Sequence, residues 1–251
     1  MQVITNKLLT EYSKTGSGKT IMFLHGWGDS SRSFADLQKH LAKQFCVISL
    51  DLPGFGASQP PDKAWKLEDY ALFVQTFLEK INSKPVYAIV AHSNGGALAI
   101  YGLAQKQLAA KKLILIGAAG IRDQQKTKRL LLKIIAKTGK TATFWLPIEK
   151  KQQLRKRLYG VVGSDMLLVP HMQETFKQTV RQDVQAEAAK LKLPTLLLYG
   201  ENDKATPPLY GEIYNQLIQG SRLKILASAG HFVHHDQQAQ CLALIQDFLV
   251  S

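Results

Sequence analysis

The sequence predicts an α/β fold in which a mostly parallel central sheet carries helices on both faces. Two observations support this prediction. Apolar runs of strand length alternate with helical patterns along most of the chain, and these runs are apolar almost throughout. Continuous apolar runs are typical of parallel strands that are buried on both faces of a sheet. The chain has 251 residues, enough to bury one full core.

Six segments are predicted to be strands, most of them with Gly, Pro or Asp at a boundary. In chain order they are 21–24, 45–50, 85–90, 112–116, 194–199 and an edge strand at 222–227. Five segments have helical periodicity: 34–43, 67–81, 96–107, 208–218 and 237–249. Strands therefore alternate with helices, as they do in a sheet that is covered on both sides.

One stretch interrupts this alternation. Residues 121–186 have helical patterns and many basic residues, and we expect them to form a helical lid. The core domain would then consist of residues 1–120 and 187–251. From Ile121 to Asp183 there are 14 Lys and Arg against 5 Asp and Glu, so this stretch carries +9 of the total net charge of +13. Such a surface is either merely solvated or attracts anionic ligands, an acidic protein or an anionic membrane.

The composition argues against several classes of protein. No apolar run approaches the ~20 residues that span a bilayer, and residues 1–14 lack the apolar core of a signal peptide. Cys46, in a predicted strand, and Cys241, in a predicted helix, give neither a disulfide framework nor metal-ligand spacing. No nucleic-acid-binding motif is visible. We therefore expect a cytoplasmic protein with no metal, no cofactor and no nucleic-acid partner; the sequence does not indicate an oligomeric state.

The segment TGSGKT at 15–20 looks like a nucleotide-phosphate loop. Such a loop aims backbone N–H groups and a helix N-terminus at phosphate, so a helix must follow it. Here an apolar strand is predicted to follow, and Ser13 stands where the first glycine would be. We therefore interpret the segment as a Gly-rich hairpin turn.

A serine stands at a predicted strand-to-helix junction. The run 86–100 reads VYAIVAHSNGGALAI, with Ser93 after the strand and Gly95 and Gly96 opening a helix of small residues. This is the G-x-S-x-G pattern with Ala91 in its first place, which holds a serine hydroxyl on a tight turn at the carboxyl end of a sheet. An ordinary βα turn can have the same composition, so the motif alone is not decisive.

A nucleophilic serine needs a base and a carboxylate that orients the base. Asp203 lies in the exit loop of the strand 194–199, and His231 follows the last predicted strand. The order Ser, Asp, His is the one associated with this kind of fold. Each residue alone is weak evidence, because an Asp in such a loop is usually a helix cap and nearby His234 or His235 could be polar residues at a helix start.

Acyl transfer also needs hydrogen-bond donors where negative charge develops on the carbonyl oxygen. One backbone N–H would come from Asn94, directly after the serine, and the other from Trp27, in the loop after the strand 21–24. Glycines at 26 and 28 would let this backbone approach closely. We expect His25 to be a structural histidine that bonds to the backbone.

Taken together, five motifs resemble the α/β-hydrolase superfamily over nearly the whole chain. They are HGWG at 25–28, DLPGFG at 51–56, AHSNG at 91–95, GEND at 200–203 with Pro207, and GH at 230–231. The first two look most like the pimeloyl-carrier-protein methyl ester carboxylesterases and the hydrolases of meta-cleavage products. The resemblance implies a nucleophile, Ser93, an acid, Asp203, a base, His231, and oxyanion N–H groups from Trp27 and Asn94.

The resemblance also bears on the neighbouring residues. A serine at position 93 argues against dehalogenases and epoxide hydrolases, whose nucleophile at this place is a carboxylate. Asp51 is expected to stabilise a turn. In the resembled family the lid covers the pocket, so the substrate would contact Gly26 and Trp27 from the core and Phe144 and Trp145 from the lid, although an apolar run on a lid more often packs internally.

We therefore expect a serine hydrolase that cleaves a carboxylic ester or a related acyl compound through an acyl-enzyme. Its substrate would be a small acyl compound, and the basic lid is compatible with an anionic one or with one carried by an acidic protein. C–C bond hydrolysis and acyl transfer use the same site, and a non-catalytic binder would keep the same pocket. These alternatives stay open.

Overall fold

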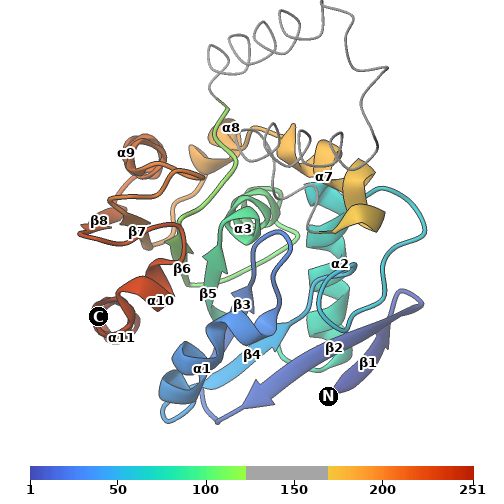
Figure 1. Cartoon of the computed structure of the whole chain (residues 1–251). Helices are drawn as coiled ribbons and strands as arrows, with labels where there is room; N and C mark the ends of the chain where they lie inside the picture. Colours follow the sequence, from blue (N-terminus) through green and yellow to red (C-terminus); the bar gives the residue numbers. More distant parts are fainter. Residues whose placement is uncertain (123–168) are drawn as a thin grey trace, which may run out of the picture. The chain divides into compact units, whose positions relative to one another are not determined.

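Eight strands of the described residues form one sheet, in the order β1-β2-β4-β3-β5-β6-β7-β8 (Figure 1). The computed structural model describes residues 1–122 and 169–251. The sheet belongs to a unit that comprises Met1–Ile121 and Glu174–Ser251. β1 pairs antiparallel with β2, and β2 with β4, whereas all the other pairs are parallel. The prediction of a mostly parallel sheet is confirmed.

The strands are β1 (Gln2–Thr5), β2 (Leu8–Thr15), β3 (Thr20–Leu24), β4 (Cys46–Leu50), β5 (Val86–His92), β6 (Lys112–Ile116), β7 (Thr195–Gly200) and β8 (Arg222–Leu226). The helices are η1 (Ser31–Phe34), α1 (Ala35–Leu41), α2 (Leu67–Lys80), α3 (Asn94–Ala104), η2 (Pro170–Met172), α7 (Gln173–Val180), α8 (Gln185–Ala188), α9 (Pro208–Leu217), α10 (Val233–Asp236) and α11 (Gln238–Val250). All six predicted strands and all five predicted helices are present, within three residues of their expected ends, and β8 lies at a sheet edge.

The two N-terminal strands were not predicted. Buried, half-buried and exposed residues mix along β1 and β2, so neither strand has the continuous apolar run that marks the others.

The position of β2 in the sheet corrects the interpretation of the segment 15–20. The segment 15–20 is not a hairpin turn, because β2 and β3 lie on opposite sides of β4. A strand does follow Lys19, as expected, so the helix that a phosphate loop requires is absent there.

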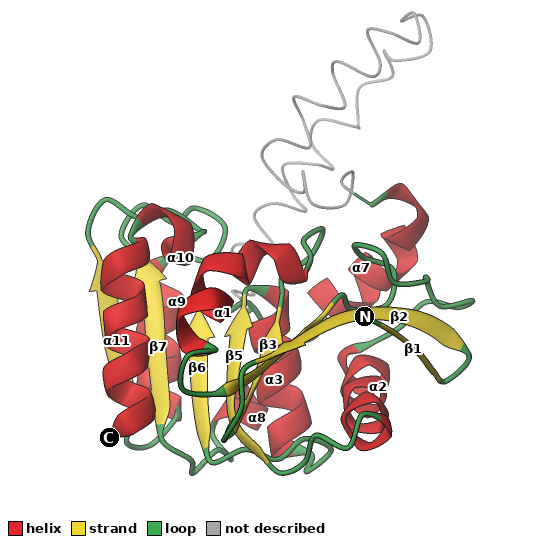
Figure 2. Cartoon of the chain, turned by 90° about the horizontal axis from the view of Figure 1, so that it is seen from below, coloured by secondary structure: helices red, strands yellow, loops and turns green. Residues whose placement is uncertain are grey.

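Helices cover both faces of the sheet (Figures 1 and 2). α1 and α11 pack on one face, in a core cluster that includes Val90 of β5 and Ile114 of β6. α2, α3, α8 and α9 lie on the other face. All six residues of β7 are buried, which explains why its sequence reads as an uninterrupted apolar run.

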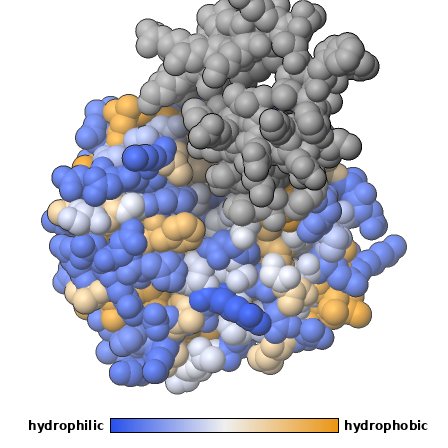
Figure 3. All heavy atoms as spheres, in the orientation of Figure 1, coloured by the Kyte–Doolittle hydropathy of each residue, from blue (hydrophilic) through white to orange (hydrophobic). Residues whose placement is uncertain are grey.

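One face of the described residues is mostly hydrophilic. On the face shown in Figure 3, hydrophilic side chains predominate and apolar ones form small separate patches. Within 1–122 and 169–251, no helix combines the length and the apolar character that crossing a membrane requires. Cys46 and Cys241 are buried and unpaired, in β4 and α11.

The lid expected at 121–186 lies largely outside the described residues. Its described C-terminal part contains η2, α7 and the first two residues of α8. There, Gln182 accepts a hydrogen bond from the backbone N–H of Leu67, and Thr175 accepts one from that of Trp65. These bonds join α7 and the turn after it to the start of α2.

The first turn of α3 packs so closely against the end of β3 that there is no room for a side chain at Gly95. A Cβ atom there would lie 2.6 Å from the carbonyl oxygen of His25 and closer still to that of Leu24. Helix propensity favours alanine over glycine by about 1 kcal/mol, but backbone atoms cannot move aside cheaply. The close approach of strand and helix therefore outweighs the local preference.

We expect Gly95→Ala to lower the free energy of unfolding by about 2 kcal/mol, measured by urea denaturation, because overpacking against backbone strains the junction. Gly102→Ala is the comparison in the same helix, since its Cβ would meet side-chain atoms, of Leu108 and Ala71, and not the backbone. If Gly95→Ala is no more destabilising than Gly102→Ala, the close approach does not constrain the fold.

Candidate active site

Ser93 is held in an unusual backbone conformation between β5 and α3. Its φ is 51° and its ψ is −119°, in a region that costs a non-glycine residue about 1–3 kcal/mol. Its N–H donates to the carbonyl oxygen of Ile116, 3.0 Å away, and its own carbonyl accepts from the N–H groups of Gly96 and Ala119. These bonds hold the strained turn that the G-x-S-x-G pattern predicts.

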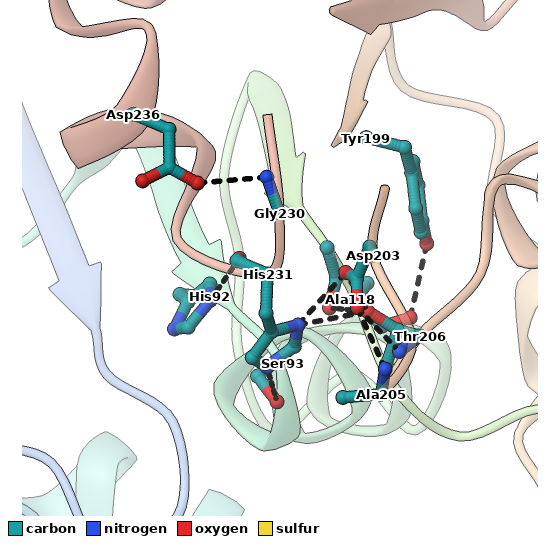
Figure 4. Close-up of polar contacts among 11 residues, drawn as sticks. His92, Ser93, Ala118, Tyr199, Asp203, Ala205, Thr206, Gly230, His231 and Asp236 are labelled. Atoms are coloured by element: carbon teal, nitrogen blue, oxygen red, sulfur yellow. Dashed lines mark hydrogen bonds and ion pairs between the residues drawn. The ribbon is translucent and has the colours of Figure 1, made fainter. Parts of the chain in front are cut away.

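His231 lies between Ser93 and Asp203 (Figure 4). Its Nε2 is 2.9 Å from Ser93 Oγ, and its Nδ1 is 2.8 Å from Asp203 Oδ2. Because a carboxylate only accepts hydrogen bonds, Nδ1 carries the ring hydrogen and Nε2 is left to accept the serine hydroxyl hydrogen. The side chain of His231 is 21% exposed and that of Asp203 is fully buried, so solvent reaches the imidazole but not the carboxylate.

The Asp203 carboxylate is saturated with hydrogen bonds. Oδ1 accepts from the backbone N–H groups of Ala205 and Thr206, at 2.8 and 2.9 Å. Oδ2 accepts from His231. Burial raises the pKa of Asp203, but the bonds and the charge interaction with His231, together with the bonds from Thr206, hold that pKa below its usual value. Asp203 therefore stabilises its own turn with one oxygen and orients His231 with the other. The role of a capping residue and the role of a partner for the histidine, both considered from the sequence, are compatible.

Thr206 is a site residue that sequence reasoning missed. Its Oγ1 lies 2.7 Å from Asp203 Oδ2, 3.1 Å from His231 Nδ1 and 2.9 Å from the carbonyl oxygen of Gly117. The hydroxyl has one hydrogen, which it can donate to the carboxylate or to the carbonyl. The available signal was the spacing of a turn Asp and a Thr three residues later, a pattern of local capping.

The loop after β3 packs directly on the nucleophile. A Cβ atom at Gly26 would lie 3.0 Å from Ser93 Cβ and 3.1 Å from His92 Nδ1, so only glycine fits there without displacing a neighbour. Trp27 follows Gly26 in this loop. Asn94 is the first residue of α3, and the N–H groups of a helix's first turn have no partner within the helix. The structure thus brings both expected oxyanion segments beside Ser93.

Aromatic side chains flank the loop. The ring of Trp27 lies 4.8 Å from that of Phe55 and 5.0 Å from that of Phe176, between ring centroids. Phe176 lies on α7, and its position in a basic, helical stretch of sequence gave no sign of this contact. Phe144 and Trp145, the expected substrate contacts from the lid, lie outside the described residues.

Two polar residues have the structural roles expected of them. His25 Nδ1 donates to the carbonyl oxygen of Gly26, and His25 Nε2 accepts from the N–H of Leu52. Burial holds the pKa of His25 below its usual value. Asp51 accepts from the N–H groups of Ser31 and Ala57 and so fixes a turn. In the described ranges, no group of three or more His, Cys, Asp or Glu is arranged to hold a metal ion.

The fold and the site together define a class of protein: an α/β hydrolase, with a serine, a histidine and an aspartate hydrogen-bonded at the carboxyl edge of a mostly parallel sheet. The sequence pattern of the alpha/beta hydrolase family matches residues 21–244. The chain belongs to this family, as its resemblance predicted.

Similar proteins cover nearly its whole length. The AB hydrolase superfamily protein YisY of Bacillus subtilis is 29% identical over 93% of this chain and 92% of its own. A pimeloyl-[acyl-carrier protein] methyl ester esterase of Neisseria meningitidis is 25% identical over 92% of this chain and 93% of its own. The structure of a meta-cleavage product hydrolase from Pseudomonas fluorescens has a TM-score of 0.75 at 20% identity, covering 99% of this chain and 96% of that one. The last similarity is one of fold.

Stability should fall in acid because His234 is buried beside the site. Burial, followed by the charges of His235 and His231, lowers the pKa of His234 to about 3. The unfolded chain takes up this proton near pH 6.5. Between about pH 6.5 and 3 only the unfolded state binds it, so the free energy of unfolding decreases as the pH falls.

We expect His234→Gln to flatten this dependence by up to about 1.4 kcal/mol per pH unit, measured by urea unfolding at several pH values from 7 to 5. Glutamine does not titrate and can still hydrogen-bond to Ser33, whose Oγ lies 3.1 Å from His234 Nε2. His40→Gln, on α1, is the control. A slope unchanged by His234→Gln would show that folding does not lower the pKa of His234.

Proposed function

We propose that the chain is a serine hydrolase that cleaves a carboxylic ester or a related acyl compound. The observation that carries the proposal is the position of the His231 imidazole, within hydrogen-bond distance of both Ser93 Oγ and Asp203 Oδ2. A serine hydroxyl is a weak nucleophile until such a base removes its proton. Ser93, His231 and Asp203 thus supply a nucleophile, a general base and a group that orients the base.

The proposed reaction has two halves. Ser93 Oγ attacks the acyl carbon while its proton passes to His231 Nε2, and the negative charge that develops on the carbonyl oxygen is stabilised by the N–H groups of Asn94 and Trp27. His231 then gives the proton to the leaving alkoxide, and an acyl-enzyme remains. Water, deprotonated by His231, attacks this ester, and Ser93 recovers its proton as the acid leaves. Asp203 stabilises the imidazolium in both halves.

Ester hydrolysis is proposed ahead of two alternatives that use the same residues. The relative from Neisseria meningitidis is named as an ester hydrolase, whereas the similarity to the C–C bond hydrolase concerns the fold at 20% identity. An acyltransferase would replace the attacking water with an alcohol or an amine. Measuring turnover of an ester, a meta-cleavage product and an ester with added alcohol separates the three.

The basic stretch leads us to propose an anionic substrate or one carried by an acidic protein. Residues 121–183 carry a net charge of +9, and we propose that residues 121–186 form a lid over a core of 1–120 and 187–251. Phe144 and Trp145 are proposed as apolar contacts of the acyl group, beside Gly26 and Trp27. A cytoplasmic location and an absence of cofactors complete the proposal.

Ser93→Ala should abolish both ester turnover and labelling by a fluorophosphonate, a reagent that phosphonylates activated serines. The melting temperature should stay close to that of the original protein. Ser228→Ala is a matched control, because Ser228 also has a positive φ, of 59°, and lies in a loop after a strand. Labelling that persists in Ser93→Ala would move the nucleophile to another residue.

Asp203→Asn should lower kcat by about 10³- to 10⁴-fold with little change in KM, since an amide neither fixes the required tautomer nor stabilises an imidazolium. Steady-state kinetics on one ester measure both constants. Asp247→Asn, on the exposed side of α11, is the control. An Asp203→Asn variant with full activity would remove Asp203 from the proposed triad.

Carboxylate-bearing esters should have a higher kcat/KM than neutral esters of equal length, and the advantage should shrink in salt. The Debye length falls from about 10 Å at 0.1 M to about 3 Å at 1 M, so electrostatic steering weakens. Replacing Arg155, Lys156 and Arg157 with Gln should cause part of that loss at low salt. If the preference is the same at both salt concentrations, the basic stretch has no part in substrate selection.

A further inference from the structure

The residue before Ser93 is hydrogen-bonded to the loop that carries the proposed base. His92 is the last residue of β5 and is 1% exposed. Its Nε2 lies 3.0 Å from the backbone carbonyl oxygen of His231, 139 positions further along the chain (Figure 4). Because a carbonyl only accepts, His92 Nε2 is the donor and carries the ring hydrogen.

This assignment fixes the state of the rest of the ring. Because burial keeps this ring neutral, His92 Nδ1 is then an unprotonated acceptor, and it has no hydrogen-bond partner among the described residues. It faces Gly26, where a Cβ atom would come within 3.1 Å of it. A buried polar atom without a partner costs free energy. A histidine at position 92 is therefore disfavoured unless the hydrogen bond of its Nε2 compensates for the unpaired Nδ1.

The surroundings keep the ring neutral and in place. Burial, then the charges of His234 and His231, hold the pKa of His92 well below its usual range, although the bond to the His231 carbonyl opposes this and His235 adds to it. Ring centroids of His231, Phe232 and His234 lie 4.7, 5.1 and 5.0 Å from that of His92. The ring therefore packs against three neighbouring rings, and its Nε2–H points at the carbonyl oxygen of His231.

The bond from His92 is one of the hydrogen bonds that hold the loop between β8 and α10. Gly230 N–H donates to Asp236 Oδ2 at 2.7 Å, and Asn202 N–H donates to the carbonyl oxygen of Ala229 at 2.8 Å. At His231 itself, the carbonyl is held by His92. The backbone that carries the base is thus tied to the residue adjoining the nucleophile.

We propose that His92 is a positioning residue, which sets the His231 imidazole at hydrogen-bond distance from Ser93 Oγ through the His92 Nε2–H bond to the His231 carbonyl. The inference rests on the proposed function, because it assigns His231 as the base. A displacement of about 1 Å at a reacting group can cost on the order of 10²-fold in rate. Loss of the bond should therefore lower kcat and leave substrate binding largely unchanged.

His92→Leu tests this directly, since leucine fills the buried space without a donor. We expect kcat, and the rate of labelling by a fluorophosphonate, to fall about 10- to 100-fold while KM stays close to its original value. His92→Gln should recover most of the kcat and of the labelling rate, because its side-chain N–H reaches about as far as Nε2 of the histidine. His92→Asn has the same amide on a shorter chain, should behave like His92→Leu, and replaces it if that variant does not fold.

The control is His40→Gln, which removes another histidine bonded to a backbone carbonyl, that of Asp36, away from the site. Melting temperatures of all variants separate a positioning role from a loss of folding. Labelling of His92→Leu at the original rate would overturn the inference, as would equal losses in the Leu and Gln variants at unchanged melting temperatures. An original protein that is not labelled at all contradicts the proposed function itself.

A spectroscopic measurement checks the same bond without activity. In a long-range ¹H–¹⁵N spectrum of histidine-labelled protein, assigned by His92→Gln, the His92 ring should appear as the neutral tautomer with hydrogen on Nε2. A ring protonated on Nδ1 at neutral pH would contradict the inference, whatever the enzyme does.

Discussion

The positive φ of Ser93 is the constraint on which the rest of the site depends. The strand β5 must end and the helix α3 must begin within one residue, and the turn is tight enough to point the serine hydroxyl away from the sheet. Small residues on both sides make this possible: Gly95 lies against the carbonyls of Leu24 and His25, and Gly26 lies against Ser93 itself. The strain is sustained by hydrogen bonds to Ile116, Gly96 and Ala119.

The parallel sheet brings the other groups to this turn. Loops that follow parallel strands all emerge at the same edge, so the exits of β5, β7 and β8 meet there although they are far apart in sequence. Hydrogen bonds then hold each loop, some within the loop and some from a neighbouring strand or its exit. Asp203 and Thr206 stabilise the exit of β7, Asp236 and His92 hold the exit of β8, and Tyr199 donates to Ala118 in the exit of β6. These hydrogen bonds hold Asp203 and His231 in the geometry that the proposed reaction requires.

Much of the fold could be predicted from the sequence, because strands buried on both faces leave a continuous apolar run. β6 and β7 are such strands. β1 and β2 could not be found in this way, since their half-exposed residues mix with buried ones and give no clear periodicity. The hairpin interpretation of residues 15–20 was wrong for a related reason: strand order depends on pairing across the sheet, which the local sequence of a turn does not record.

In the site, too, some residues could be predicted from the sequence and others could not. Ser93, Asp203 and His231 could be selected because each stands in a loop with a recognisable local pattern, and the structure brings them within hydrogen-bond distance. Thr206 had a local signal, its position three residues after Asp203, but no pattern that marks it as part of a site. His92 and Phe176 could not be selected, because their significance comes from contacts with residues distant in sequence. His92 in particular is an unremarkable polar residue until the loop of His231 is placed against it.

The most direct test of the account is to identify the acylated residue. The protein is mixed with p-nitrophenyl acetate, quenched in acid and digested, and the peptides are weighed by mass spectrometry. If Ser93 is the nucleophile, one acetyl group is expected on Ser93, formed together with a burst of p-nitrophenol. Sustained ester turnover with no acetyl group on Ser93, or with the acetyl group on a different residue as a competent intermediate, would contradict it.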